Sequence, residues 1–130
     1  MATIFTKIIK GEIPSYKIYE DEQFYAFLDI SPLTKGHTLL IPKNETDYIF
    51  DVDDAVLSEM IVVAKKIAQA IEKAITCNRV GLMVIGLEVP HAHIHLVPIH
   101  NEGDMVLTND RVELSDDQFE SIAKKIRSFI

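Results

Sequence analysis

The sequence predicts an α+β domain in which one five-stranded antiparallel sheet is covered by a long helix and followed by a C-terminal helix. Three observations predict this fold: apolar residues recur at helical spacing in two stretches, five short segments lie between turn residues, and several of these segments are joined by short links. Short links favour antiparallel pairing, because parallel strands need long crossover connections. A chain of 130 residues is long enough to bury its own core, so we expect one domain over residues 1–130.

The first predicted elements follow one another along the chain. Residues 4–9 are expected to form a short helix ahead of the sheet. The predicted strands, each bounded by turn residues, are residues 17–20, 24–28, 37–41, 80–85 and 91–97.

The long helix lies between the third and fourth predicted strands. Its apolar residues recur three and four places apart, which places them on one face against a core. They are Leu57, Met60, Ile61, Ala64, Ile67, Ala68, Ile71, Ala74 and Ile75. We expect an aspartate cap from Asp51, Asp53 or Asp54 and an end near Asn78, a residue that tolerates the left-handed conformation.

The C-terminal helix is predicted from a capping box. Ser115 is followed three places later by Gln118, a pattern that satisfies two free amides at a helix start. The apolar residues that follow share one helical face, and they are Phe119, Ile122, Ala123, Ile126 and Phe129.

Composition excludes several classes of protein. A net charge of -7 argues against binding long nucleic acids, which clustered lysine and arginine hold, although a mononucleotide needs only a few local donors. Apolar stretches fall short of the roughly 18 residues of a membrane span, so no membrane partner is expected. Without a basic and then apolar N-terminal leader, and with Cys77 as the single cysteine, we expect a cytoplasmic protein.

The last predicted strand carries three histidines. Residues 91–97 alternate strictly between histidine and aliphatic or small residues, and the strand period of two places His91, His93 and His95 on one face. Neighbouring imidazoles would stand roughly 6.5 to 7 Å apart, close enough to hold one phosphate group or one metal ion. We therefore expect a shared site on this face.

Two chemistries suit such a row of imidazoles. Neutral imidazole is a common zinc ligand, and zinc accepts three of them. Alternatively, one imidazole attacks phosphorus while its neighbours stabilise the phosphate oxygens. The spacing alone leaves both open, since the only carboxylates nearby in sequence are Glu88 and Glu102.

Several motifs resemble the histidine triad (HIT) family, and within it the Hint-like branch of bacterial type. The run His-Ala-His-Ile-His at residues 91–95 resembles the family's motif. Residues 4–15 (IFTKIIKGEIPS), 19–21 (YED) and 26–32 (AFLDISP) are similar to its N-terminal signature, and residues 36–43 (GHTLLIPK) to the segment with its fourth histidine. The resemblance spans nearly all of residues 3–99 and implies the fold predicted above.

The resemblance also implies an activity. His93 would attack the α-phosphorus of a purine nucleotide conjugate, most simply a nucleoside phosphoramidate, to give a nucleotidyl-histidine that water hydrolyses without metal or cofactor. His91 and His95 would contact the phosphate, and His37 would complete the site. Asp29 would bind the ribose hydroxyls, and the base pocket would be lined by Ile4, Phe5, Ile8, Phe27, Leu28 and Ile30. Members of this branch are homodimers, so a homodimer is expected.

Two departures from the family pattern matter. Where bacterial relatives often have zinc-binding cysteines, this chain has Thr3 and Thr6, and Asn44 and Glu45 replace a further histidine, so we expect no bound zinc. The usual loop before the triad is shortened to residues 86–90 and carries a carboxylate at Glu88. Glu88 either favours a cationic leaving group, such as lysine or another amine, or points away.

Two other functions stay open. One is a metal-dependent hydrolase that uses the histidines as ligands. The other is a nucleotide-binding module with little catalysis, in keeping with the altered loop.

Overall fold

The computed structural model describes residues 2–130, so Met1, part of the predicted domain of residues 1–130, lies outside the described residues. Five strands form one sheet in the order β1-β2-β3-β5-β4, and all neighbours are antiparallel. The strands are β1 (Lys17–Glu20), β2 (Phe24–Leu28), β3 (Thr38–Pro42), β4 (Arg79–Met83) and β5 (Ile94–Ile99). The predicted α+β class and five-stranded antiparallel sheet are confirmed.

Three α-helices cover the sheet: α1 (Ile4–Ile9), α2 (Asp54–Ala74) and α3 (Asp116–Arg127). Short 3-10 helices at Ile49–Asp51 and Glu102–Met105 complete the structure. The predicted capping box at Ser115 and Gln118 is present, whereas the N-cap of α2, Asp53, makes no side-chain hydrogen bond. Ile75 is extended, so α2 ends at Ala74, before the predicted end near Asn78. Among residues 2–130, no helix has the length and apolar character needed to cross a membrane.

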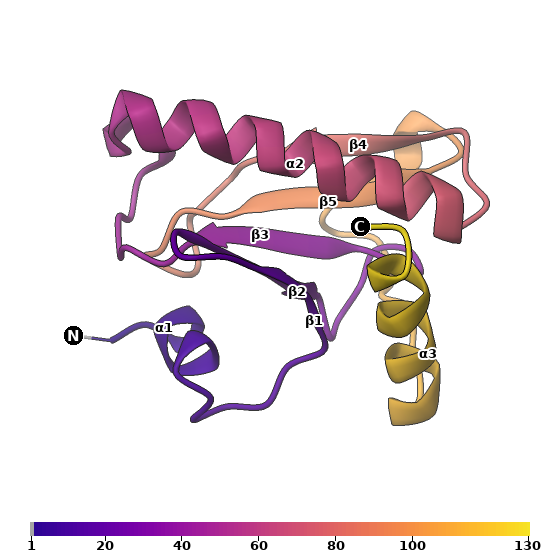
Figure 1. The fold of residues 1–130 in the computed structure, drawn as a ribbon. Coiled ribbons are helices and arrows are strands. Elements are labelled where there is room, and N and C mark those ends of the chain that lie inside the picture. The colour runs from indigo at the N-terminus through magenta and orange to yellow at the C-terminus, as the bar shows by residue number, and fades with distance from the viewer. Residues whose placement is uncertain (1) are drawn as a thin grey trace.

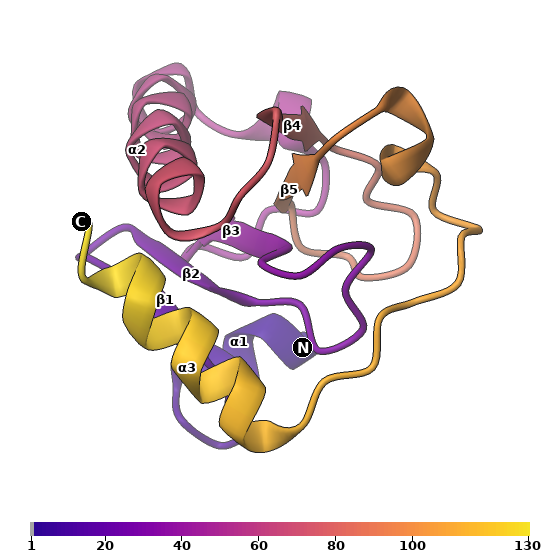
Figure 2. The ribbon, with the colours of Figure 1, turned by 90° about the vertical axis from the view of Figure 1, so that its right-hand side faces the viewer.

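The helices lie on opposite faces of the sheet, α2 and α3 on one and α1 on the other (Figures 1 and 2). The period of two along each strand divides the apolar residues between these faces. The larger core, under α2 and α3, includes Ile18, Phe24, Leu28, Leu40, Met60, Ile67, Ile71, Leu96, Phe119 and Ile126. The smaller one, under α1, consists of Phe5, Ile8, Tyr25, Phe27, Leu39 and Ile41.

Strand β5 places histidines on the α1 face. Ile94 and Leu96 enter the core beneath α2, so His95 points to the opposite face, where its partner across β3 is Leu39. The strand begins three residues later than predicted, because the amide of Ala92 donates to Thr46 in a loop. His91 and His93 therefore precede the regular strand.

Candidate active site

A cavity of about 580 Å³ opens on the α1 face beside His93 and His95. The short helix α1 covers only part of this face (Figure 1), and the other lining residues come from five further stretches of the chain. Its lining residues are Phe5, Asp29, Ser31, Leu39, Ile85, Gly86, Leu87, Glu88, Val89, His93, His95, Leu107, Thr108 and Arg111. The cavity thus combines apolar walls with a few convergent polar groups, as ligand sites do.

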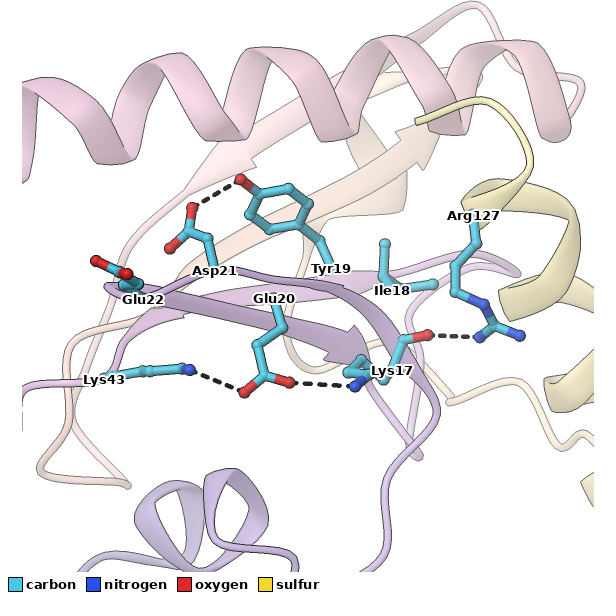
Figure 3. Close-up of a pocket in the computed structure, with 8 residues that line it drawn as sticks. All are labelled: Lys17, Ile18, Tyr19, Glu20, Asp21, Glu22, Lys43 and Arg127. Carbon is cyan, nitrogen blue, oxygen red and sulfur yellow. Dashed lines mark hydrogen bonds and ion pairs between the residues drawn. The ribbon is translucent and has the colours of Figure 1, made fainter.

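A second cavity, of about 600 Å³, lies at the edge strand β1 (Figure 3). Three basic and three acidic residues line it, and Glu20 lies 3.1 Å from Lys17 and 2.8 Å from Lys43. Because opposite charges balance there and no histidine lines it, the cavity at β5 is the better candidate.

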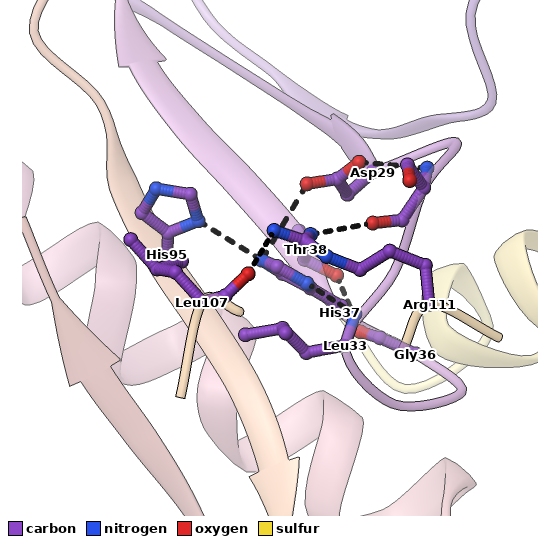
Figure 4. Close-up of polar contacts among 9 residues, drawn as sticks. Asp29, Leu33, Gly36, His37, Thr38, His95, Leu107 and Arg111 are labelled. Atoms are coloured by element: carbon purple, nitrogen blue, oxygen red, sulfur yellow. Dashed lines mark hydrogen bonds and ion pairs between the residues drawn. The ribbon is translucent and has the colours of Figure 1, made fainter. Parts of the chain in front are cut away.

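A hydrogen-bonded chain through His37 fixes the proton of His95 (Figure 4). The amide of Leu33 donates to Nδ1 of His37 at 3.0 Å, so that nitrogen is unprotonated and the neutral ring carries its proton on Nε2. Nε2 of His37 lies 3.0 Å from Nδ1 of His95 and donates to it. His95 therefore carries its own proton on Nε2 and offers a hydrogen-bond donor to the cavity.

His93 has the opposite tautomer. Its Nδ1 lies 2.8 Å from the carbonyl oxygen of His91, which can only accept, so Nδ1 carries the proton. Nε2 then keeps its lone pair and has no hydrogen-bond partner within residues 2–130. The rings of His93 and His95 are 5.0 Å apart, which places a nucleophile beside a donor.

His91 does not reach the cavity. It is fully buried beneath α1, where Nε2 donates to the carbonyl of Pro42 at 2.6 Å and Nδ1 accepts from the hydroxyl of Thr3 at 2.9 Å. Both ring nitrogens are therefore occupied by the protein. The expectation that His91 contacts the phosphate is not met by this geometry, because residue 91 precedes the strand and packs under the helix.

Burial lowers the pKa of His37, His91 and His95. The pKa of His37 falls to about 3 and that of His95 to about 4, mainly through desolvation and then through mutual repulsion with neighbouring histidines and Arg111. Because His37 is neutral, its 3.7 Å approach to Asp29 is not an ion pair.

Asp29 lies at the cavity, as expected of a ribose-binding residue. Its Oδ1 accepts from the amide of Ser31 at 2.8 Å. Burial raises the pKa of the carboxyl, although that amide and the charge of Arg111 oppose the shift.

Arg111 is the charged cavity residue that the sequence did not predict. Its guanidinium donates to the carbonyls of Ser31 at 2.7 Å and Leu107 at 3.0 Å, and these contacts hold it over the cavity (Figure 4). Among the lining residues of the described chain it is the one lysine or arginine. It stands in an irregular segment without periodicity, and no sequence signal distinguishes it from other exposed arginines.

The predicted base-pocket residues separate into four groups. Phe5 lines the cavity, and its ring packs edge-on against His93 at 5.0 Å. Ile8 and Phe27 lie in the core under α1, while Ile4 and Ile30 are 49% and 73% exposed. The prediction for Leu28 is wrong, because strand alternation turns it into the core beneath α2.

Neither polar cluster near the histidines fits a zinc ion. Ligand atoms of Asp29, His37 and His95 lie within 4.8 Å of one another, but the proton that the Leu33 amide directs onto Nε2 of His37 occupies the nitrogen that would bind metal. At α1, Thr3 meets His91 through a hydroxyl, where zinc prefers thiolate or imidazole. That this protein binds no zinc stays a prediction.

The chain is similar in sequence and in fold to proteins of one family. The family model described as the HIT domain matches residues 10–102. An uncharacterized HIT-like protein from Borreliella burgdorferi is 37% identical to this chain, and the match covers 95% of this chain and 94% of that protein. An adenosine 5′-monophosphoramidase from Saccharomyces cerevisiae is 43% identical, and the match covers 78% of this chain and 65% of that protein. A HIT-like protein involved in cell-cycle regulation from Bartonella henselae superposes with a TM-score of 0.85 at 34% identity, covering 98% of this chain and 96% of that one.

The buried imidazoles make stability depend on pH. An unfolded histidine has a pKa of about 6.5. The pKa of His37 in the folded protein is about 3. At pH values between these two pKa values the folded protein binds fewer protons than the unfolded chain, so the free energy of unfolding falls as the pH is lowered through this range. Between about pH 7 and about pH 5, the free energy of unfolding of His37→Gln should fall by about 2 kcal/mol less than that of the wild type. Urea unfolding at the two pH values measures this difference. The exposed His100→Gln control should match the wild type; equal losses in all three proteins would contradict the assignment.

Proposed function

The chain belongs to the histidine triad (HIT) family, and from this premise we propose that it hydrolyses or transfers at the α-phosphorus of a purine nucleoside phosphoramidate or a related nucleotide conjugate. The pairing of His93 and His95 carries the proposal, since a free Nε2 lone pair stands beside an Nε2–H donor in one cavity. This pairing suits attack on phosphorus, where negative charge develops on the oxygens. The S. cerevisiae relative, an adenosine 5′-monophosphoramidase, supports the phosphoramidate as substrate.

In the first step, Nε2 of His93 attacks the α-phosphorus and forms a phosphorus–nitrogen bond. The bond to the leaving amine breaks, and the amine keeps the electron pair and takes a proton from solvent. His95 donates from Nε2 to a phosphate oxygen, and His37 holds it in that tautomer. The nucleotidyl-imidazole is cationic, and the carbonyl of His91 stabilises it through Nδ1–H of His93.

In the second step, water attacks the same phosphorus from the cavity. The bond to Nε2 breaks, the nucleoside monophosphate leaves, and His93 returns to its neutral form as the surplus proton passes to solvent. The imidazoles supply both nucleophile and donor, so the proposed reaction uses no cofactor. His91 acts through its carbonyl and not on the phosphate.

Glu88 bears on the leaving group. It stands in an exposed loop among the residues that line the cavity. A carboxylate there repels an anion and attracts a cation. We propose that the leaving amine is cationic, as a lysine side chain would be.

A homodimer is the proposed assembly. Strand β4 lies at the edge of the sheet, with its outer hydrogen-bonding groups unpaired within the described chain, and Leu82 on it is 47% exposed. Pairing with a second copy of β4 would cover this edge.

Replacing the nucleophile tests the mechanism. We expect His93→Ala to lower kcat for adenosine 5′-phosphoramidate by at least about a thousandfold, because no other cavity group has a free imidazole lone pair. Initial rates measure this, with circular dichroism to verify folding and His100→Ala as the control. If folded His93→Ala still turns over substrate, His93 is not the nucleophile. If a chelator abolishes wild-type turnover and zinc restores it, the metal-dependent hydrolase is favoured. If the wild type binds the substrate without turnover, the nucleotide-binding module is favoured.

Asp29 is expected to recognise the ribose. Asp29→Asn keeps the shape but loses the charged acceptor, so KM for adenosine 5′-phosphoramidate should rise about tenfold. The matched substrate is the 2′,3′-dideoxy analogue, which has no hydroxyls to bind. An equal rise in KM for both substrates would exclude the ribose contact.

Arg111 is expected to supply the positive charge that the neutral imidazoles do not. Arg111→Gln should weaken binding of adenosine monophosphate about tenfold, with the difference shrinking as salt is added. Titration calorimetry measures it. Arg127→Gln is the matched control, because Arg127 also donates to a backbone carbonyl but lies at the second cavity. Equal affinities for the two variants would remove Arg111 from the binding site.

A further inference from the structure

A polar cluster outside the cavity joins the start of α1 to the loop after β3. Oε1 of Glu45 accepts from the amide of Thr3 at 2.6 Å and from the hydroxyl of Thr6. The hydroxyl of Thr3 accepts from the amide of Thr6 at 3.1 Å and donates to Nδ1 of His91 at 2.9 Å. Thr3 is buried and every polar group it offers at this point is used, so its side chain has one well-defined position.

The position of α1 depends on such contacts. A helix of six residues is far below the roughly 12 to 15 residues that an isolated helix needs in water, so tertiary anchors must hold it. Its Phe5 ring packs edge-on against both His91, at 5.8 Å, and His93, at 5.0 Å. A shift of α1 would therefore move the wall against which the His93 ring rests.

His91 connects this cluster to the cavity. Its ring is held from two sides, by the carbonyl of Pro42 and by the hydroxyl of Thr3, while its own carbonyl accepts from Nδ1 of His93. With the Thr3 contact removed, the ring keeps its bond to Pro42 and its packing against Phe5 but loses the hydrogen bond that holds Nδ1. The backbone that aims the imidazole of His93 then loses its support.

We propose that Thr3 and Glu45 are positioning residues for His93, acting through α1 and His91 although neither lines the cavity. The turnover test rests on the proposed function. If the imidazole of His93 is displaced by about 1 Å, its attack on phosphorus slows by up to about a hundredfold, because the reacting atoms must be aligned. Substrate binding is affected little, since Thr3 and Glu45 do not touch the ligand.

The experiment compares hydroxyl removal at neighbouring positions of α1. Thr3→Val should lower kcat for adenosine 5′-phosphoramidate between about tenfold and about a hundredfold with KM within about twofold of wild type, and Thr3→Ser should restore most of the rate. Glu45→Ala, a change at an exposed side chain, should lower kcat in the same direction. Thr6→Val is the comparison variant, because its hydroxyl meets Glu45 and lies 3.3 Å from the hydroxyl of Thr3 without touching His91, and its kcat should fall less than that of Thr3→Val.

A second readout needs no turnover. In isotope-labelled wild-type protein, nitrogen NMR should show His93 in the Nδ1–H form alone, whereas Thr3→Val should give a mixture of both tautomers. The proposal is overturned if Thr3→Val has the kcat of the wild type and an unchanged His93 signal. It is also overturned if Thr3→Val and Thr6→Val lose kcat equally and in proportion to a loss of folded protein. An inactive wild type with the expected NMR change would refute the proposed function and leave the positioning intact.

Discussion

The amide of Leu33 donates to Nδ1 of His37, and this contact determines where the protons lie on two imidazoles. His37 must donate from Nε2, so His95 must accept on Nδ1 and donate from its own Nε2. A carbonyl at His91 imposes the reverse order on His93. Rigid backbone groups thus give two neighbouring histidine rings, His93 just before β5 and His95 within it, opposite tautomers.

Burial adds a second constraint, because it removes charge from the histidines. The pKa of His95, lowered to about 4, keeps this ring a neutral donor near neutral pH. The fixed positive charge then falls to Arg111, whose guanidinium cannot lose its proton. In a chain of net charge -7, Arg111 is the one lysine or arginine among the described residues that line this cavity.

The periodic features of the fold could be predicted from sequence, because they depend on neighbours in the chain. The capping box at Ser115 and the placement of His95 opposite Ile94 and Leu96 follow from local spacing. The burial of His91 could not be predicted, since it depends on α1 folding back over residues distant in sequence. The motif around Leu28 assigns it to the base pocket, but the alternation of side chains along β2 places it on the other face of the sheet. This error could have been avoided from the sequence. Arg111 depends on carbonyls at Ser31 and Leu107, contacts that no local pattern encodes.

The two ends of the chain are not equivalent for handling the protein. The N-terminal residues run directly into α1, whose Phe5 is part of the cavity wall, and the backbone amide of Thr3 is itself engaged with Glu45. The C-terminus follows α3, which packs on the opposite face of the sheet (Figure 2). A purification tag, a fluorescent fusion or a surface tether attached at the N-terminus therefore adjoins the helix that packs against His91 and His93. The same attachment after Ile130 follows a helix on the other face of the sheet.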